Sequence, residues 1–307
     1  MMSDGMTFRL GLCQMNAVAD EDANIAAIRH SLSQFAADGC DLALLPEYAF
    51  CLGGRNAMRA AARDDSAWRE LLGTLCREAG VAALFGGVVL RDGDKLYDRA
   101  YVISEQGAPL GCYDKMHLFP FRPEHPEAMI ETEFFTPGLS LPQPVSHHGW
   151  RIGLSICFDL RFPELYVAQW PCDLLICPAA FAAHTGRVHW SVLLRSRAIE
   201  NQSWVAGVGQ GGANAATGLE LYGHSAIYDP WGLPIAEVPH SRALNLVVSI
   251  NKERLAQCRA ALPMGRPEPG CGHCACGCHK ALSRPRKRQM LRAKARPRSR
   301  APARSKG

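Results

Sequence analysis

Short apolar runs alternate with amphipathic segments along this chain, and this alternation restricts the possible folds more than any other feature of the sequence. Thr7 to Gln14 is typical of a buried strand, and Asp22 to Asp38 places Ile25, Ile28 and Leu32 on one face of a helix. Further strands are predicted at 41–45, 81–90, 96–104, up to about 113, 150–156, 173–177, 203–208, 224–228, 234–238 and 244–250, and further helices at 64–79, 161–169, 190–201 and 252–262. The pattern predicts an α/β sandwich, in which helices pack on sheets.

The charge of the chain is divided unevenly between two parts. The net charge is +5 over 307 residues. Residues 265–307 contain 13 Lys and Arg and the single acid Glu268, a net +12, which leaves −7 for residues 1–264. We therefore predict a folded domain at 1–264 and a basic, low-complexity tail at 265–307 that is disordered.

Cysteine content and hydropathy bear on the compartment. We expect no secretory signal, because Met1 to Leu10 has no apolar run behind a basic stretch. The longest apolar run, around Leu174 to Ala183, is too short to span a bilayer. Thirteen cysteines in such a chain indicate free thiols in a reducing compartment. The sequence thus predicts a cytoplasmic protein with no membrane partner.

Three ionisable side chains follow predicted strands or begin loops. Glu47 follows the strand 41–45, Lys115 begins a long loop, and Cys157 follows the strand 150–156. Functional sites in open α/β sheets form at the carboxyl ends of strands. A thiolate is a good nucleophile, a glutamate can move its proton, and an ammonium can stabilise an oxyanion. These are the groups that amide hydrolysis requires.

Five motifs in order resemble the nitrilase superfamily of carbon–nitrogen hydrolases, and most closely its omega-amidase and Nit-type branch. The resemblance extends from about residue 7 to about residue 262. The motifs are Tyr113 to Phe119, Cys157 to Phe162, Ser196 to Gln202, Gly223 to Ser225 and Asp229 to Gly232. The resemblance implies a four-layer α-β-β-α sandwich that forms a homodimer.

The resemblance also implies catalytic roles. Glu47 is expected to be the general base, Lys115 the group that holds the oxyanion, and Cys157 the nucleophile. The substrate is expected to be a small carboxylate-bearing amide, which releases ammonia and leaves a thioester on Cys157. The chemistry implied needs no cofactor and no metal.

A second glutamate of the family lies a fixed distance before a Pro-Gly pair. Pro137-Gly138 is present here, and Glu131 fits the spacing. The competing glutamates in the same loop are Glu124, Glu127 and Glu133. We rank Glu131 first.

Three residues are candidates for substrate binding, namely Phe158, Arg161 and Phe181. Arg161 could bind a substrate carboxylate with two parallel hydrogen bonds, or it could pair internally with Asp159 or Glu164. Phe181 could line a pocket or pack in the core. Both alternatives for each residue stay open on sequence alone.

Other functions compete with this one. The same Glu–Lys–Cys set would serve a nitrile or an N-carbamoyl substrate. A Cys–His hydrolase is a further alternative, with His184, His189 or His224 as the base, and it requires a histidine touching Cys157.

The tail offers an alternative of another class. Cys271 to His279 has six possible metal ligands, and Arg284 to Lys306 could bind the phosphates of a nucleic acid. The ligand spacing is not that of a zinc finger, and no aromatic residues are available for base stacking. Relatives continue after their last helix with an extension that holds the dimer, whereas this tail resembles the product of a shifted reading frame. We favour no evolved function for it.

Overall fold

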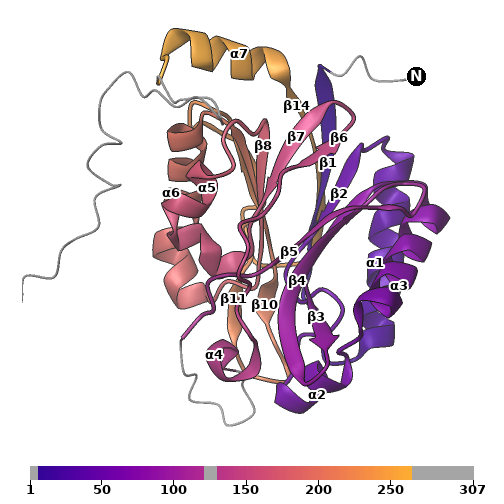
Figure 1. The fold of residues 1–307 in the computed structure, drawn as a ribbon. Coiled ribbons are helices and arrows are strands. Elements are labelled where there is room, and N and C mark those ends of the chain that lie inside the picture. Colours follow the sequence, from indigo (N-terminus) through magenta and orange to yellow (C-terminus); the bar gives the residue numbers. More distant parts are fainter. Residues whose placement is uncertain (1–5, 121–129, 265–307) are drawn as a thin grey trace, which may run out of the picture. The chain divides into compact units, whose positions relative to one another are not determined.

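The computed structural model describes residues 6–120 and 130–264. Within this part of the chain, two six-stranded sheets pack against each other, with helices on the outer face of each (Figure 1). The arrangement has four layers in the order helix, sheet, sheet, helix, and it confirms the predicted α/β sandwich.

The first sheet has three parallel strands at its centre. In spatial order its strands are β14 (Leu244–Asn251), β1 (Thr7–Gln14), β2 (Leu42–Leu45), β3 (Ala83–Asp92), β4 (Lys95–Ile103) and β5 (Pro109–Asp114). β1, β2 and β3 run parallel, and β14, β4 and β5 pair antiparallel to their neighbours. The segment after β2 therefore leaves the sheet at the edge where the parallel strands end.

The second sheet repeats this plan. Its strands are β13 (Pro234–Glu237), β12 (Ala226–Tyr228), β9 (Trp204–Gly209), β8 (Leu174–Ala179), β7 (Trp150–Leu154) and β6 (Val145–His147). β7, β8 and β9 are parallel. A separate short pair joins β10 (Gly211–Ala213) to β11 (Glu220–Tyr222). The segment after β7 leaves its sheet at the carboxyl end of the strand, as the segment after β2 does.

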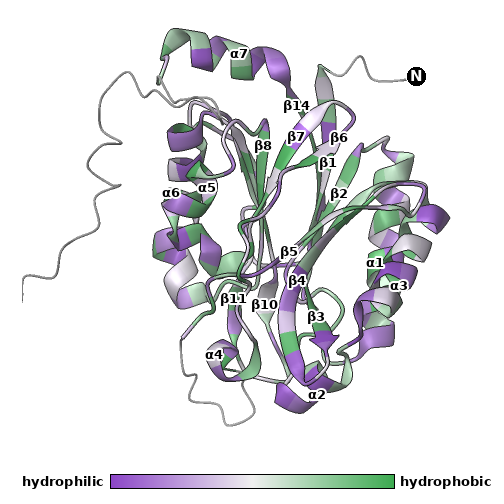
Figure 2. Cartoon of the chain, viewed as in Figure 1, coloured by the Kyte–Doolittle hydropathy of each residue, from purple (hydrophilic) through white to green (hydrophobic). Residues whose placement is uncertain are grey.

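Alternate side chains of each strand belong to different apolar clusters of the core. Leu42 and Leu44 of β2 belong to the cluster between the two sheets, whereas Ala43 and Leu45 belong to the cluster beneath the helices of the first sheet. Because successive side chains of a strand point to opposite faces, a continuous apolar run fills both layers. Apolar residues accordingly colour the strands and the inward sides of the helices in Figure 2.

Helices cover the outer faces. α1 (Glu21–Ala37) and α3 (Asp65–Ala79) lie on the first sheet, and α5 (Pro163–Val167) and α6 (Ala183–Asn201) lie on the second (Figure 1). The remaining helices are α2 (Arg55–Ala60), α4 (Glu131–Phe134) and α7 (Lys252–Ala261). Asp64 caps the amino end of α3 by accepting a hydrogen bond from the Ala67 amide, and Gly80 ends it in the left-handed conformation.

Some boundaries differ from those predicted. α6 begins at Ala183 instead of Trp190, because its first turns contain Gly186 and polar residues that hide the helical period. The helix predicted at 161–169 is wrong in its extent. A 3-10 turn, η1 (Cys157–Arg161), comes first and α5 begins at Pro163, since proline starts a helix more readily than it continues one. The sequence prediction lacked α2, α4, β6, β10 and β11.

The predictions for the tail at 265–307 and for Glu124 and Glu127 lie outside the described residues, so the two-part division of the chain stays a prediction. Within residues 6–120 and 130–264, no helix combines the length and the apolar character that crossing a membrane requires.

Candidate active site

The three predicted catalytic side chains lie where strands end. Glu47 follows β2, Lys115 follows β5, and Cys157 follows β7 and opens η1. Cys157 has a φ of +46°, which is uncommon for a residue other than glycine and is a form of backbone strain found at functional sites. The strand–turn junction therefore holds the cysteine in a special backbone conformation.

Lys115 lies inside a cage of three carboxylates. Its Nζ is 2.7 Å from Glu47 Oε1, 2.8 and 2.9 Å from the two oxygens of Glu131, and 3.3 Å from Asp98 Oδ2. All four side chains are buried. The structure therefore brings the predicted Glu47, Lys115 and Glu131 together, and it adds Asp98, which sequence reasoning missed.

Glu131 is distinguished from the described competitor in its loop. Glu133 lies on the surface, 3.9 Å from Arg55. Glu131 Oε2 also accepts a hydrogen bond from the amide of Phe119 at 2.7 Å. The geometry thus favours Glu131 over Glu133, as ranked from the sequence.

The charges of this cage require a bound proton. Three ionised carboxylates around one ammonium would leave two net negative charges in the interior, at a high cost in desolvation. Burial raises the pKa of Asp98 well above its ordinary value. Lys115 lowers this pKa, and the negative charges of Glu47 and Glu131 offset part of that effect. We infer that Asp98 keeps its proton at neutral pH.

The environment of Asp98 agrees with a neutral acid. Its buried Oδ1 is within hydrogen-bonding reach of Glu47, but two ionised carboxylates cannot bond to each other because neither has a proton to donate. A proton on Oδ1 would donate to Glu47. Oδ2 lies 3.0 Å from the hydroxyl of Tyr48, which burial keeps protonated by raising its pKa. Asp98 thus bridges Tyr48 and Glu47.

Backbone groups fix Glu47 from the other side. Its Oε2 accepts a hydrogen bond from the Ala180 amide at 2.7 Å, and its carbonyl accepts one from the Gln210 side chain at 3.0 Å. Gly87, at φ +61°, lets the chain pass beside the cage, since a Cβ there would lie 2.6 Å from both Glu47 Cγ and Asp98 Oδ1. These contacts hold Glu47 beside the cage.

The Cys157 thiol is buried and electrostatically unfavourable to ionise. Burial raises its pKa well above the ordinary value, the charge of Glu47 raises it further, and Lys115 lowers it only in part. The resting thiol is therefore protonated and needs a base. The charged groups with the largest effect on it are Glu47, Lys115 and Glu131, and no histidine is among them.

The histidines of the alternative mechanism have other partners. His189 Nδ1 lies 3.2 Å from Arg161, and His224 Nδ1 lies 3.2 Å from Glu237. His117 Nδ1 lies 2.7 Å from Asp159 Oδ1. The geometry favours a carboxylate over an imidazole as the base for Cys157.

A small pocket, with a volume of about 30 Å³, lies against the nucleophile. Its lining residues are Phe119, Glu131, Cys157, Phe158, Arg161, Ala180, Phe181, Ala182 and Thr185. All three predicted substrate-binding residues are therefore in the wall, and Phe181 packs both there and in the core. The size suits a small acyl group.

Arg161 lines the pocket and forms no ion pair with a carboxylate of the described residues. Its guanidinium lies over the rings of Phe158 and Phe181, 5.6 and 5.3 Å from their centroids. No ion pair joins it to Asp159 or Glu164 in the described structure. Asp159 instead accepts bonds from Tyr113, His117 and the Ile156 amide. Burial lowers the pKa of Arg161, as for a charge short of compensation.

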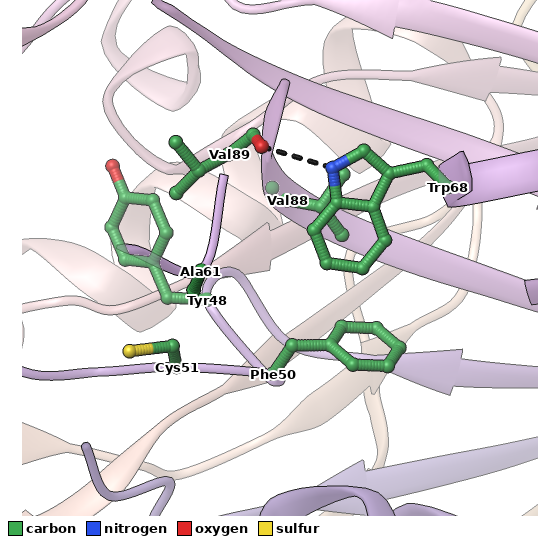
Figure 3. Close-up of a pocket in the computed structure, with 8 residues that line it drawn as sticks. Tyr48, Phe50, Cys51, Ala61, Trp68, Val88 and Val89 are labelled. Carbon is green, nitrogen blue, oxygen red and sulfur yellow. Dashed lines mark hydrogen bonds between the residues drawn. The ribbon is translucent and has the colours of Figure 1, made fainter. Parts of the chain in front are cut away.

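A second small cavity lies beside Tyr48 (Figure 3). Its lining residues are Tyr48, Phe50, Cys51, Ala61, Trp68, Gly87, Val88 and Val89. The cavity volume is about 10 Å³, enough for at most one water. Trp68 Nε1 donates to the Val89 carbonyl at 2.9 Å. This cavity is packing space behind Tyr48 and not a ligand site.

The cage of Glu47, Asp98 and Glu131 has the ligand types of a metal site. The Lys115 ammonium occupies the position that a metal ion would need, within 3.3 Å of all three carboxylates. Its positive charge compensates the carboxylates as the charge of a metal ion would.

Known proteins are similar to this chain over the region that contains the site. The sequence profile named carbon-nitrogen hydrolase matches residues 9–260. The deaminated glutathione amidase of Mus musculus is 34% identical over 276 residues, which are 86% of this chain and 84% of that protein. The chloroplastic omega-amidase of Arabidopsis thaliana is 30% identical over 272 residues, or 86% and 73% of the two proteins.

A solved structure is similar as well. A mutant of the amidase from Nesterenkonia sp. AN1 superposes with a TM-score of 0.69 at 26% identity, covering 85% of this chain and 97% of that one. That structure shows covalent addition of the acetamide moiety of fluoroacetamide at the active site cysteine. The profile match includes every residue of the cage and the pocket.

Proposed function

The chain belongs to the carbon-nitrogen hydrolase family of the nitrilase superfamily, and from this we propose that it cleaves a small carboxylate-bearing amide through a thioester on Cys157, releasing ammonia. The observation that carries the proposal is the buried cage of Glu47 and Lys115 acting on the Cys157 thiol at the wall of a small pocket. The amidase names of its relatives support the choice of an amide.

In the first half of the reaction, Glu47 accepts the thiol proton and the Cys157 sulfur attacks the amide carbon. The C–N bond then breaks, Glu47 returns the proton to the leaving nitrogen, and ammonia departs from the thioester. The covalent acetamide adduct on the cysteine of the Nesterenkonia amidase supports a cysteine nucleophile.

In the second half, water attacks the thioester carbon while Glu47 accepts a proton from that water. The C–S bond breaks, the carboxylic acid leaves, and the proton returns to sulfur. One water is consumed, and no cofactor is required at any step.

Lys115 acts through its charge. Its N–H groups are already directed at Glu47, Glu131 and Asp98, so it holds these carboxylates in place while its positive charge stabilises the oxyanion. Glu131 and neutral Asp98 are positioning residues for this pair. No metal is part of the proposal.

We assign the substrate carboxylate to Arg161. A half-buried guanidinium between two aromatic rings, without a carboxylate partner in the described structure, is suited to bidentate binding of such a group. Phe158 and Phe181 would then hold the short apolar stem between the carboxylate and the amide.

The substrate class is tested by ammonia release from matched panels of ω-amides, nitriles and N-carbamoyl compounds of equal chain length. Turnover of the amide alone supports the proposal. Faster turnover of the nitrile or the N-carbamoyl compound would reassign the substrate while keeping the cysteine chemistry.

Arg161→Met is expected to lower kcat/KM for a carboxylate-bearing ω-amide by about 30- to 100-fold, mostly through KM, since the loss of a desolvated charge pair costs about 2–3 kcal/mol. The same variant should hydrolyse a neutral amide of equal length as the parent does. Arg187→Met, which changes an exposed arginine of α6, is the control and should have no effect. Equal losses on charged and neutral amides would exclude carboxylate binding by Arg161.

We also propose that the enzyme is a cytoplasmic homodimer that needs no nucleic acid. The nine cysteines of the described residues are all free thiols, in keeping with a reducing compartment. Val188, Val192 and Ile199 form an exposed apolar stripe along α6, spaced by four and seven positions on one helical face. Such a stripe is suited to pairing with a second copy.

Val192→Asp is expected to convert the dimer to monomer at micromolar concentration, because the paired stripes would then bury two unpaired carboxylates. Sedimentation velocity measures the outcome, and circular dichroism checks the fold. Leu139→Asp changes a 92% exposed leucine away from the helix and is the matched control. A parent that sediments as a monomer would contradict the pairing.

A further inference from the structure

A second group of ionisable side chains lies at the other end of the sandwich. Glu105 follows β4, and His147 and His148 belong to the hairpin between β6 and β7. β4, which contains Asp98, leads to Glu105, and the hairpin that carries the two histidines leads into β7, which Cys157 follows. Asp98 lies within β4 and Cys157 follows β7, so the two sites are separated by the length of the strands.

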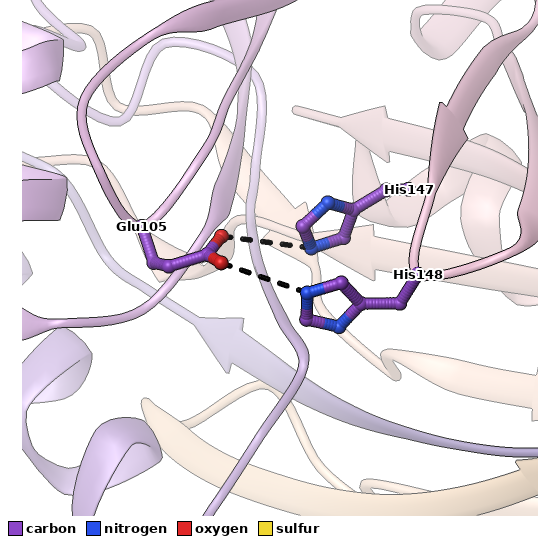
Figure 4. Close-up of side chains that lie close together, drawn as sticks. All are labelled: Glu105, His147 and His148. Carbon is purple, nitrogen blue, oxygen red and sulfur yellow. Dashed lines mark ion pairs between the residues drawn. The ribbon is translucent and has the colours of Figure 1, made fainter. Parts of the chain in front are cut away.

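The geometry of the group resembles an open metal site (Figure 4). Glu105 faces both imidazoles, with Oε1 3.6 Å from His148 Nε2 and Oε2 4.0 Å from His147 Nε2. All three possible ligand atoms lie within 4.8 Å of one another. Bonds of about 2.0–2.1 Å to a tetrahedral zinc ion put ligand atoms roughly 3.3 Å apart. Movements below 1 Å would therefore bring these atoms to coordinating distance.

Neighbouring groups orient the His148 ring for coordination. His148 Nδ1 lies 3.2 Å from Asp41 Oδ1, and a hydrogen bond between these two atoms leaves Nε2 facing Glu105. A carboxylate behind a histidine is the usual outer partner of a metal-bound imidazole. The ring also stacks on His147, with centroids 4.0 Å apart.

His147 is buried and held edge-on against Phe8, with centroids 6.1 Å apart. Its Nε2 lies 3.2 Å from the Asp41 carbonyl. Metal binding would move the His147 proton to Nδ1 and replace this hydrogen bond.

Two observations indicate that the group is more than an ion pair. Glu105 Oε2 is buried and has no hydrogen-bond partner in the described structure, which is costly for a carboxylate oxygen. His148 also has a φ of +45° and forms, with Gly149 at +77°, the two-residue turn of the β6–β7 hairpin. Asparagine is the favoured residue at such a position, and histidine is less common there.

We propose that Glu105, His147 and His148 bind one divalent transition metal ion, zinc above all, with water as the fourth ligand. Nitrogen and carboxylate donors suit zinc and exclude magnesium and calcium as preferred ions. Because Glu105 belongs to the first sheet and the histidines to the second, the ion would join the two sheets at the end remote from Cys157. Its role would be to stabilise the sandwich.

The test is zinc titration of the full chain followed by calorimetry and thermal unfolding. His148→Asn removes a ligand and keeps the hairpin, since Asn-Gly is the preferred sequence for this turn. Other zinc ligands of the chain, including Cys271 to His279, are shared by parent and variant and cancel in the difference. His30→Ala changes an exposed histidine of α1 and is the matched control.

We expect the parent and His30→Ala to bind one more zinc ion than His148→Asn and Glu105→Gln. At a hundredfold excess over Kd, zinc should raise the Tm of the parent by about 5 °C more than that of His148→Asn. Amide hydrolysis without zinc should be equal in all four proteins. Equal stoichiometry and equal Tm shifts in parent and His148→Asn would overturn the proposal, as would loss of the extra ion in His30→Ala.

Discussion

Cys157→Ala is expected to lower the rate of ammonia release by about 10⁴-fold or more, because the sulfur is the only nucleophile that the proposed mechanism provides. Glu47 and Lys115 would remain in place, and they cannot form the thioester on their own. Rapid quenching and mass spectrometry should show an acyl adduct on the parent and none on the variant. Normal hydrolysis by Cys157→Ala would exclude the cysteine mechanism.

Cys177→Ala provides the matched control for this substitution. Cys177 is also a buried free thiol, on β8, with its Sγ 3.9 Å from the carbonyl oxygen of Cys157. It has the same chemistry and the same local core but no position in the pocket wall. We expect Cys177→Ala to keep the adduct and most of the activity. A loss equal to that of Cys157→Ala would indicate disturbed packing and not a lost nucleophile.

Lys115→Met is expected to lower the free energy of unfolding by about 3–5 kcal/mol and to abolish hydrolysis. The substitution fits the space but leaves Glu47, Asp98 and Glu131 buried around no positive charge, and removing one partner of a buried ion pair costs about this much. Urea unfolding measures the stability. Lys95→Met changes an exposed lysine at the start of β4 and should alter stability by no more than about 0.5 kcal/mol.

The loss in Lys115→Met should also grow with pH. Burial already raises the pKa of Asp98 and Glu131 in the parent, and without the ammonium their pKa values rise further. A group whose folded pKa lies above its unfolded pKa binds protons more tightly when folded, so its contribution is present at low pH and is lost as pH rises. The variant should therefore lose more stability at pH 8 than at pH 5.5. A pH-independent loss would contradict the charge explanation.

The sequence predicted most of the parts of this site, because local patterns determine them. The apolar run before Glu47 predicts β2, and the motif around Cys157 predicts the nucleophile at the end of β7. Spacing from a Pro-Gly pair selected Glu131, which the structure places against Lys115. What local patterns could not supply was the meeting of these residues across two sheets. That meeting depends on strand order and register.

Asp98 shows where sequence reasoning stopped. In β4 it shares a face with Leu96 and Ala100, and all three are buried. The available signal was a carboxylate at a position where the alternation of the strand predicts an apolar residue. Because Asp98 stands next to the charged Arg99, the same letters could equally belong to an exposed part of the strand. Arg161 shows a similar limit. Its partners Phe181 and His189 are distant in sequence, so the choice between an ion pair and a pocket role required the fold.

The single helix α6 has a consequence for the working unit of this enzyme. Its first turn reaches Thr185 in the pocket wall, and its His189 contacts Arg161, while Val188 and Val192 face outwards from the same turns. The same helix therefore contributes both to the pocket wall and to the surface that we assign to a second copy. Separating the copies would remove the contacts on the outer side of α6. Arg161, which α6 contacts through His189, would then be held less firmly. Diluted enzyme should accordingly lose affinity for its substrate before it loses its fold, so that protein concentration itself tunes turnover.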